Sequence, residues 1–239
     1  MVIDREPAWD REELPQGEAK VRAVREMFDT IAPRYDLVNR VMTLRLDVCW
    51  RKRAVRTLAL PDRSRILDLA SGTGDLCVEL ARQHLAPISI DLSFGMLQAD
   101  RSGAPRVQAD ILRLPVPDGC ADGVTCGFAL RNLVDLGTFF DELARVLRPE
   151  GRIALIDAAQ PEHRLMRWGH GVYFGKVVPK IGGLLSDGSA YRYLPRSLSY
   201  LPPPEEMLDR LRQAGFTAVT RELLTGGAAQ LITATRSAG

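Results

Sequence analysis

Hydrophobic residues recur along the chain in two patterns, one typical of helices and one typical of short buried strands. Over residues 19–31 the apolar side chains fall three or four positions apart, which predicts a helix that ends before Pro33. A second helical pattern covers residues 36–58, with a break expected at 43–46. The apolar run at 65–70 is followed by glycines, so it predicts a buried strand that enters a tight turn.

The alternation continues to the end of the chain. Further strands are expected at 87–91, near Val107, at 121–130, at 151–157, at 218–224 and at 228–234, with helices at 76–82, 94–100, 137–147 and 205–214 between them. Strands that alternate with helices predict a mostly parallel sheet covered on both faces, with ligands at the carboxyl ends of the strands. We therefore expect a doubly wound, Rossmann-like α/β fold with seven strands, antiparallel at its C-terminal end.

Two segments do not follow this alternation of strands and helices. Residues 1–18 are polar and contain Pro and Gly, which predicts a flexible N-terminal tail. Residues 162–203 are rich in glycine and aromatic residues and are predicted to form a helical insertion on the substrate side of the sheet. Residues 19–239 are predicted to form a single domain that begins with N-terminal helices at 19–60 and includes this insertion.

Composition is that of an ordinary folded domain. The 239 residues are 46% hydrophobic and 26% charged, with a formal net charge of +2, so no overall field points to nucleic acid as a partner. Basic residues crowd one segment, 34–56. They form either a solvated helix face or a patch that approaches anionic lipid headgroups, and the sequence leaves both interpretations open.

The four cysteines have no spacing typical of metal ligands or of a disulfide framework, so no metal is expected. The acidic start of the chain does not resemble a signal peptide, and no apolar run approaches about 18 residues. These features predict a cytoplasmic protein, which could dock peripherally on the inner face of a membrane.

The glycine-rich loop at 68–75 is the first candidate for chemistry. Gly72 and Gly74 lie two positions apart, which lets the backbone approach a ligand and leaves amides at a helix N-terminus free to donate hydrogen bonds. The dinucleotide fingerprint requires a third glycine where this chain has Cys77, so pyrophosphate binding is disfavoured. A nucleoside with a carboxylate end remains a suitable ligand.

Two acidic residues follow neighbouring strands. Asp91 ends the second strand, where an acid can accept both ribose hydroxyl protons, although it could instead cap the next helix. Asp110 ends the third strand and could accept from an adenine amino group while Ile111 packs on the ring, or it could simply form a turn. Three polar strand ends on one sheet edge favour a nucleoside pocket.

Several longer segments then resemble one family. They are residues 27–39 (MFDTIAPRYDLVN), 67–75 (LDLASGTGD), Asp91 with Met96 and Leu97, 114–118 (LPVPD), 128–132 (FALRN) and 191–195 (YRYLP). The glycine loop alone is typical of any class I S-adenosylmethionine-dependent methyltransferase. Together, the segments strongly resemble the menaquinone/ubiquinone biosynthesis C-methyltransferases over roughly residues 20 to 235.

The resemblance implies roles for particular residues. The S-adenosylmethionine contacts would be Asp68, Gly72, Thr73, Gly74, Asp91, Leu92, Met96, Asp110, Ile111 and Gly127. Asn132 and Tyr191 would bind the quinol. Arg131 would orient a quinol oxygen or a water and stabilise developing phenolate charge, with Tyr35 assisting. Arg131 could equally form a salt bridge with a pocket carboxylate, and Tyr35 could be a core aromatic whose hydroxyl is satisfied.

The resemblance implies transfer of a methyl group from S-adenosylmethionine to a ring carbon of a prenylated quinol, converting demethylmenaquinol to menaquinol. The ubiquinone precursor 2-polyprenyl-6-methoxy-1,4-benzoquinol is the alternative substrate. A non-catalytic S-adenosylmethionine-binding protein is an alternative of another class, and a nicotinamide oxidoreductase is disfavoured by Cys77. A homodimer is compatible with the family, and the spacing of residues does not test it.

The chain departs from the family pattern at two places near the fifth strand. Glu150 replaces the first glycine of the usual Pro-Gly-Gly turn, and Asp157 and Ala158 stand where the family has Glu-Phe. These departures are expected to alter local geometry more than the cofactor site.

Overall fold

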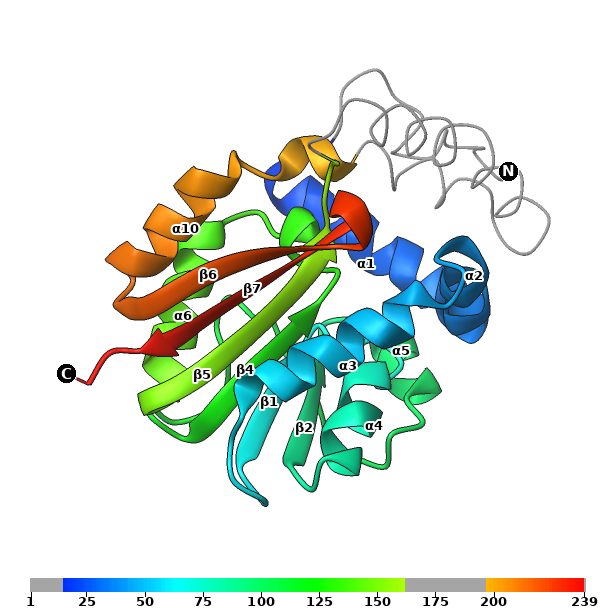
Figure 1. The fold of residues 1–239 in the computed structure, drawn as a ribbon. Helices are drawn as coiled ribbons and strands as arrows, with labels where there is room; N and C mark the ends of the chain where they lie inside the picture. The colour runs from blue at the N-terminus through cyan, green and yellow to red at the C-terminus, as the bar shows by residue number, and fades with distance from the viewer. Residues whose placement is uncertain (1–14, 162–196, 239) are drawn as a thin grey trace, which may run out of the picture.

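Seven strands form a mixed sheet in the order β3-β2-β1-β4-β5-β7-β6 (Figure 1). The computed structural model describes residues 15–161 and 197–238. The strands are β1 (Arg65–Leu69), β2 (Ala86–Asp91), β3 (Arg106–Gln108), β4 (Ala121–Gly127), β5 (Leu147–Ala158), β6 (Phe216–Leu224) and β7 (Ala229–Arg236). The first five are parallel, whereas β7 is antiparallel to both of its neighbours. The expected doubly wound sheet with an antiparallel C-terminal end is confirmed.

Helices precede, separate and cover these strands (Figure 1). They are α1 (Gly17–Ile31), α2 (Tyr35–Met42), α3 (Leu46–Leu58), α4 (Asp75–Arg82), α5 (Phe94–Ala99), α6 (Leu136–Val146) and α10 (Pro204–Gln213). Short 3-10 turns are η1 (Ala32–Arg34), η2 (Leu130–Asn132), η4 (Leu198–Tyr200) and η5 (Thr225–Gly227). The break expected at 43–46 is confirmed, because Leu44 and Arg45 adopt left-handed φ angles of 51° and 64° between α2 and α3.

Most strand boundaries lie within about two residues of the predicted ones, and the two that differ by more each have an identifiable cause. β5 begins at Leu147 rather than at 151, because Leu147 pairs with Ala121 of β4 before the regular register starts. β4 ends at Gly127 rather than at 130, because Phe128 turns the backbone into the left-handed region at φ 62° and η2 follows. Neither the pairing of Leu147 nor the backbone turn at Phe128 is encoded in local hydrophobic periodicity.

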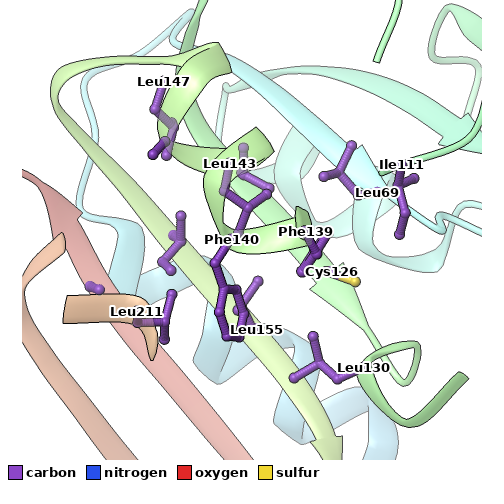
Figure 2. Close-up of a cluster of buried hydrophobic side chains, with 14 of the residues drawn as sticks. Leu69, Ile111, Cys126, Leu130, Phe139, Phe140, Leu143, Leu147, Leu155 and Leu211 are labelled. Carbon is purple, nitrogen blue, oxygen red and sulfur yellow. The ribbon is translucent and has the colours of Figure 1, made fainter. Parts of the chain in front are cut away.

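The two faces of the sheet carry separate cores. α6 and α10 cover one face, where Phe139, Phe140 and Leu143 are fully buried against the strands (Figure 2). α3 and α4 cover the other face through residues such as Trp50 and Leu80. Burying each such side chain contributes about 1.5–3 kcal/mol, so the sheet is held firmly from both sides.

A third cluster lies outside the sheet layers and joins α1, α2 and α5. It contains Met27 and Ile31 of α1, Val38 and Met42 of α2, and Met96 of α5. This cluster places the N-terminal helices next to the segment that follows β2. Within the described part of the chain, none of the helices has both the length and the hydropathy needed to span a bilayer.

The expected N-terminal tail and insertion lie largely outside the described residues. α1 begins at Gly17, two residues before the predicted start at 19, and residues 1–14 are not described. Of the insertion predicted at 162–203, only 197–203, with η4, is described.

Candidate active site

A cavity opens where the carboxyl ends of β1, β2 and β4 meet α1. It encloses about 830 Å³ with its open mouth included. Nine of the predicted site residues line it: Tyr35, Gly72, Asp91, Leu92, Met96, Asp110, Ile111, Gly127 and Asn132. The expectation that polar strand ends meet at one edge is therefore confirmed.

Asp91 provides the main negative charge on the cavity wall. Its two carboxylate oxygens accept hydrogen bonds from the backbone amides of Gly72, at 2.8 Å, and Ser93, at 2.8 Å. Because each carboxylate oxygen has a second lone pair, the group can still accept from two ligand hydroxyls. Burial raises the pKa of Asp91 to about 6, so it is ionised at neutral pH. It does not cap α5, since Ser93 accepts from the Met96 amide in that role.

The segment after β3 forms another part of the cavity wall. Asp110 is exposed, and its Oδ1 accepts from the Leu112 amide at 2.9 Å, so the predicted turn is present. Its other carboxylate oxygen is available to a ligand donor. Ile111 is buried beside it, and Leu92 and Met96 line the same cavity, which together suits a flat heterocyclic ring.

The glycine loop is shaped by hydrogen bonds within the turn. The Ser71 amide donates to the Ile90 carbonyl of β2, and the Gly74 amide donates to the Ser71 carbonyl. Gly74 has φ 84°, and a Cβ there would lie 2.7 Å from Asp100 Cγ and 2.9 Å from Ser102 Cβ. Only glycine fits this position without moving its neighbours.

Four predicted site residues lie behind the cavity wall rather than on it: Asp68, Thr73, Gly74 and Arg131. Asp68 accepts from Thr125 Oγ1 at 2.7 Å and from Cys77 Sγ at 3.3 Å, and burial raises its pKa to about 7. Thr73 donates to Asp36, which also pairs with Arg101 and so ties the glycine loop to α2. In this structure these four residues do not line the cavity, and their contacts hold the segments that do.

Arg131 forms a buried ion pair with Asp157 at the end of β5. The side chains are 6% and 0% exposed, and the Arg131 amide also donates to Asp157 Oδ2 at 3.1 Å. The salt bridge that the sequence left open is therefore present, and its carboxylate is the residue that departs from the family pattern. The pair fixes η2, whose Asn132 faces the cavity.

Tyr35 lines the cavity from the first turn of α2. Its hydroxyl has a hydrogen bond with the Asn39 side chain, and its ring lies edge-on to Phe28 with centroids 5.8 Å apart. Burial raises the pKa of Tyr35, so the hydroxyl stays protonated at neutral pH and is available as a donor.

Helix α1 supplies a wall that the sequence analysis did not anticipate. Val21, Val24, Arg25 and Phe28 line the cavity, although their periodicity indicated only an ordinary core-facing helix. Phe28 belongs to a family-like segment, which was the one available signal. Tyr191, predicted to bind the quinol, lies outside the described residues. In the two described stretches of chain, no cluster of His, Cys, Asp or Glu could hold a metal ion.

Comparisons with known proteins agree with this geometry. The model of the ubiE/COQ5 methyltransferase family matches residues 16–236. The demethylmenaquinone methyltransferase of Roseiflexus castenholzii is 40% identical, with 92% of this chain and 96% of that protein covered. The ubiquinone/menaquinone biosynthesis C-methyltransferase UbiE of Syntrophotalea carbinolica is 39% identical, with 89% and 94% covered.

Among solved structures, a methyltransferase of Haloferax volcanii in complex with the Trm112 activator is similar to this chain, with a TM-score of 0.65. The identity is 15%, and the match covers 88% of this chain and 97% of that one. At this identity the likeness concerns the fold alone. It supports the class I methyltransferase architecture predicted from the sequence.

Proposed function

The chain belongs to the ubiE/COQ5 methyltransferase family, and on that premise we propose that it methylates a ring carbon of demethylmenaquinol to form menaquinol. Its activity is S-adenosylmethionine-dependent C-methylation in menaquinone or ubiquinone biosynthesis. The demethylmenaquinone methyltransferases of Roseiflexus castenholzii and Thermus thermophilus, 40% and 41% identical, favour the menaquinone precursor as acceptor. The observation that carries the proposal is the lining of the cavity. Asp91 and Asp110 provide carboxylates that suit a nucleoside, and apolar side chains form most of the remaining wall.

The residues present fit S-adenosylmethionine. Asp91 can accept the ribose hydroxyls, and Asp110 can accept from the adenine amino group while Ile111 packs against the ring. Gly72 adds no side chain to the cavity wall, and Gly127 leaves room for the buried Leu76, because a Cβ there would lie 3.0 Å from Leu76 Cδ1. When bound, S-adenosylmethionine supplies a methyl group on a sulfonium that can be displaced by an electron-rich carbon.

The other end of the cavity suits a quinol ring. Val21, Val24 and Phe28 of α1 line the cavity together with Leu133 and Val134, so most of the wall that they form is apolar. Such a wall excludes water and favours a ring that carries a hydrocarbon tail. The quinol would therefore enter along α1, while S-adenosylmethionine occupies the edge formed by the strands.

Tyr35 and Asn132 are the polar groups that we assign to the quinol, whereas Arg25, which also lines the cavity, pairs with Asp29 at 3.8 Å. The protonated Tyr35 hydroxyl and the Asn132 amide can hydrogen-bond a quinol oxygen, and such bonds strengthen as phenolate charge develops on it. The buried Arg131 guanidinium adds positive charge near Tyr35 and holds η2 in place through Asp157. The ring carbon gains the methyl group, and its hydrogen leaves as a proton.

We further propose that the substrate reaches the cavity from a membrane surface. Leu37 and Leu44 are 56% and 73% exposed on α2 and the turn that follows it, beside the exposed Arg34 and Arg45. Apolar side chains next to basic ones suit an anionic bilayer surface. Sedimentation with anionic liposomes should be weakened by high salt, and no association at any salt concentration would remove this proposal.

The test of the main proposal is mass-spectrometric detection of product. Purified protein is incubated with S-adenosylmethionine and chemically reduced demethylmenaquinone that carries a short prenyl tail. A gain of one methyl group on the ring is expected, and the oxidised quinone serves as the control that should give none. Product only with the ubiquinone precursor would change the substrate, whereas cofactor binding without product from either would favour the non-catalytic alternative.

A further inference from the structure

Lys20 is an unusually buried cation for a helix that lies at the edge of the fold. Its side chain belongs to a residue only 2% exposed, while Glu18 and Ala19 beside it are exposed. Within the described ranges no carboxylate pairs with it, and burial lowers its pKa to about 8. Lysine is rarely buried because its ammonium loses hydration, so its partners must compensate for that loss.

The partners of Lys20 come from two other segments. Its Nζ donates to the carbonyl of Arg131 at 3.1 Å and to the carbonyl of Leu133 at 2.8 Å. It also lies 3.5 Å from the centroid of the Tyr200 ring, a cation–π contact. The Tyr200 hydroxyl donates in turn to the Pro15 carbonyl at 2.7 Å. One ammonium thus fastens the start of α1 to η2 and to η4.

The end of α1 is fastened differently. Asp29 Oδ1 accepts from Ser93 Oγ at 2.5 Å and from the Gly95 amide at 2.9 Å, both at the start of α5. Lys20 and Asp29 are nine positions apart in the sequence, or about 14 Å along the helix. Val21, Val24 and Phe28, which line the cavity, lie between these two attachments.

The two attachments hold different parts of the cavity wall, since Asn132 and Leu133 line it near one and Ser93 lines it at the other. Lys20 binds the backbone on either side of Asn132, at the end that receives the quinol. Asp29 binds the segment after Asp91, at the end that receives S-adenosylmethionine. We propose that Lys20 is a positioning residue for the quinol: it holds the apolar face of α1 and the Asn132 turn at the separation that the ring requires. This inference rests on the proposed function for the identity of the ligand.

The test is Lys20→Met in the full chain, which replaces the ammonium by an apolar side chain of similar length. The KM for demethylmenaquinol should rise about tenfold, equivalent to about 1.4 kcal/mol, while the Kd for S-adenosylmethionine stays within about twofold. Asp29→Ala is the matched control at the other end of α1, and it should weaken S-adenosylmethionine binding more than quinol binding. A purely structural role predicts equal losses of both ligands in both variants, and that result would overturn the proposal.

A second variant covers the case in which Lys20→Met does not fold. Lys20→Gln keeps an amide donor for these carbonyls but has a shorter side chain and no charge, so its KM for the quinol should rise above that of the wild type while the Kd for S-adenosylmethionine stays within about twofold. An unchanged KM in a folded variant would also overturn the proposal.

Hydrogen–deuterium exchange separates this inference from the proposed function, because it needs no substrate. In Lys20→Met or Lys20→Gln, amides of α1 and of residues 130–134 should exchange faster than in the wild type, while those of β1 and the glycine loop should not. If the wild type fails to methylate any quinol, the proposed function fails. The exchange result still tests whether Lys20 holds α1 against residues 130–134. Unchanged exchange in α1 and at 130–134 would refute the attachment.

Discussion

Gly74→Ala tests whether the glycine loop is held by steric fit. Gly74 has φ 84°, and an added Cβ would lie 2.7 Å from Asp100 Cγ and 2.9 Å from Ser102 Cβ. The left-handed conformation costs a non-glycine residue about 1–2 kcal/mol, and forcing an extra carbon into a packed site costs a further ~1–3 kcal/mol. The expected loss in the free energy of unfolding is therefore about 2–5 kcal/mol.

Gly103→Ala is the matched control. Gly103 has φ 76°, but a Cβ there would meet no atom within 4 Å. It should lose only the conformational part, about 1–2 kcal/mol. The difference between the two variants isolates the overlap with Asp100, whose carboxylate accepts from Ser89 at 2.6 Å and from the Ser102 amide at 2.6 Å.

The assay is urea unfolding followed by circular dichroism, with thermal unfolding as a check. In a domain of this size 1 kcal/mol corresponds to roughly 2–4 °C in Tm. Gly74→Ala should also weaken S-adenosylmethionine binding in calorimetry, because the Gly72 amide that contacts Asp91 lies in the same turn. Equal losses in the two variants would show that Asp100 and Ser102 yield without resistance, and the steric reasoning would then be wrong.

Four further changes have definite expected outcomes. Glu150→Gly should raise the free energy of unfolding in urea by up to about 1 kcal/mol, because the exposed Glu150 adopts φ 65°, and unchanged stability would contradict this. Asp91→Asn should weaken S-adenosylmethionine binding by about 10- to 200-fold in calorimetry, the effect of losing charged hydrogen bonds worth ~1.5–3 kcal/mol. The pKa of Asp91 is raised to about 6, so wild-type affinity should fall as the pH drops below 6 and the carboxylate takes up its proton, whereas the Asn variant should show no such decline. Asp157→Asn should lower stability by about 3–5 kcal/mol, because it leaves a buried guanidinium without its counter-charge. Tyr35→Phe should lower kcat at least ~10-fold with unchanged S-adenosylmethionine affinity, and an unchanged kcat would exclude Tyr35 from catalysis.

The order and type of most elements follow from local sequence. The run at 65–70, the acid that ends β2 and the helix at 137–147 are encoded by periodicity and by turn residues, and the structure has each within a few residues of its predicted position. The early start of β5 was not predictable in this way, because Leu147 becomes a strand residue only by pairing with Ala121. Pairing between distant segments has no local signature.

The candidate site likewise has features that local sequence predicts and features that depend on contacts between distant segments. Asp91 and Asp110 could be placed on one sheet edge from their positions after strands, because parallel strands end together. The pairing of Arg131 with Asp157 could not be predicted from local sequence. Asp157 is 26 residues away, and the position of its side chain depends on how β5 pairs in the sheet. The role of α1 as a cavity wall was also hidden, because an amphipathic helix shows which side is apolar but not what that side will contact.

The position of β7 has a consequence for how the chain is made. β7 lies between β5 and β6, and it pairs with Arg152–Ala158 of the one and with most of the other. It is also synthesised after the six other strands. Until it emerges from the ribosome, the edge of β5 has no partner on that side and β6 has none within the described sheet. A nascent chain that stalls before residue 229 would expose a long apolar strand edge, and such an edge invites pairing with other chains. Expression at reduced translation speed should therefore favour aggregation of this protein unless a chaperone covers β5 until β7 arrives.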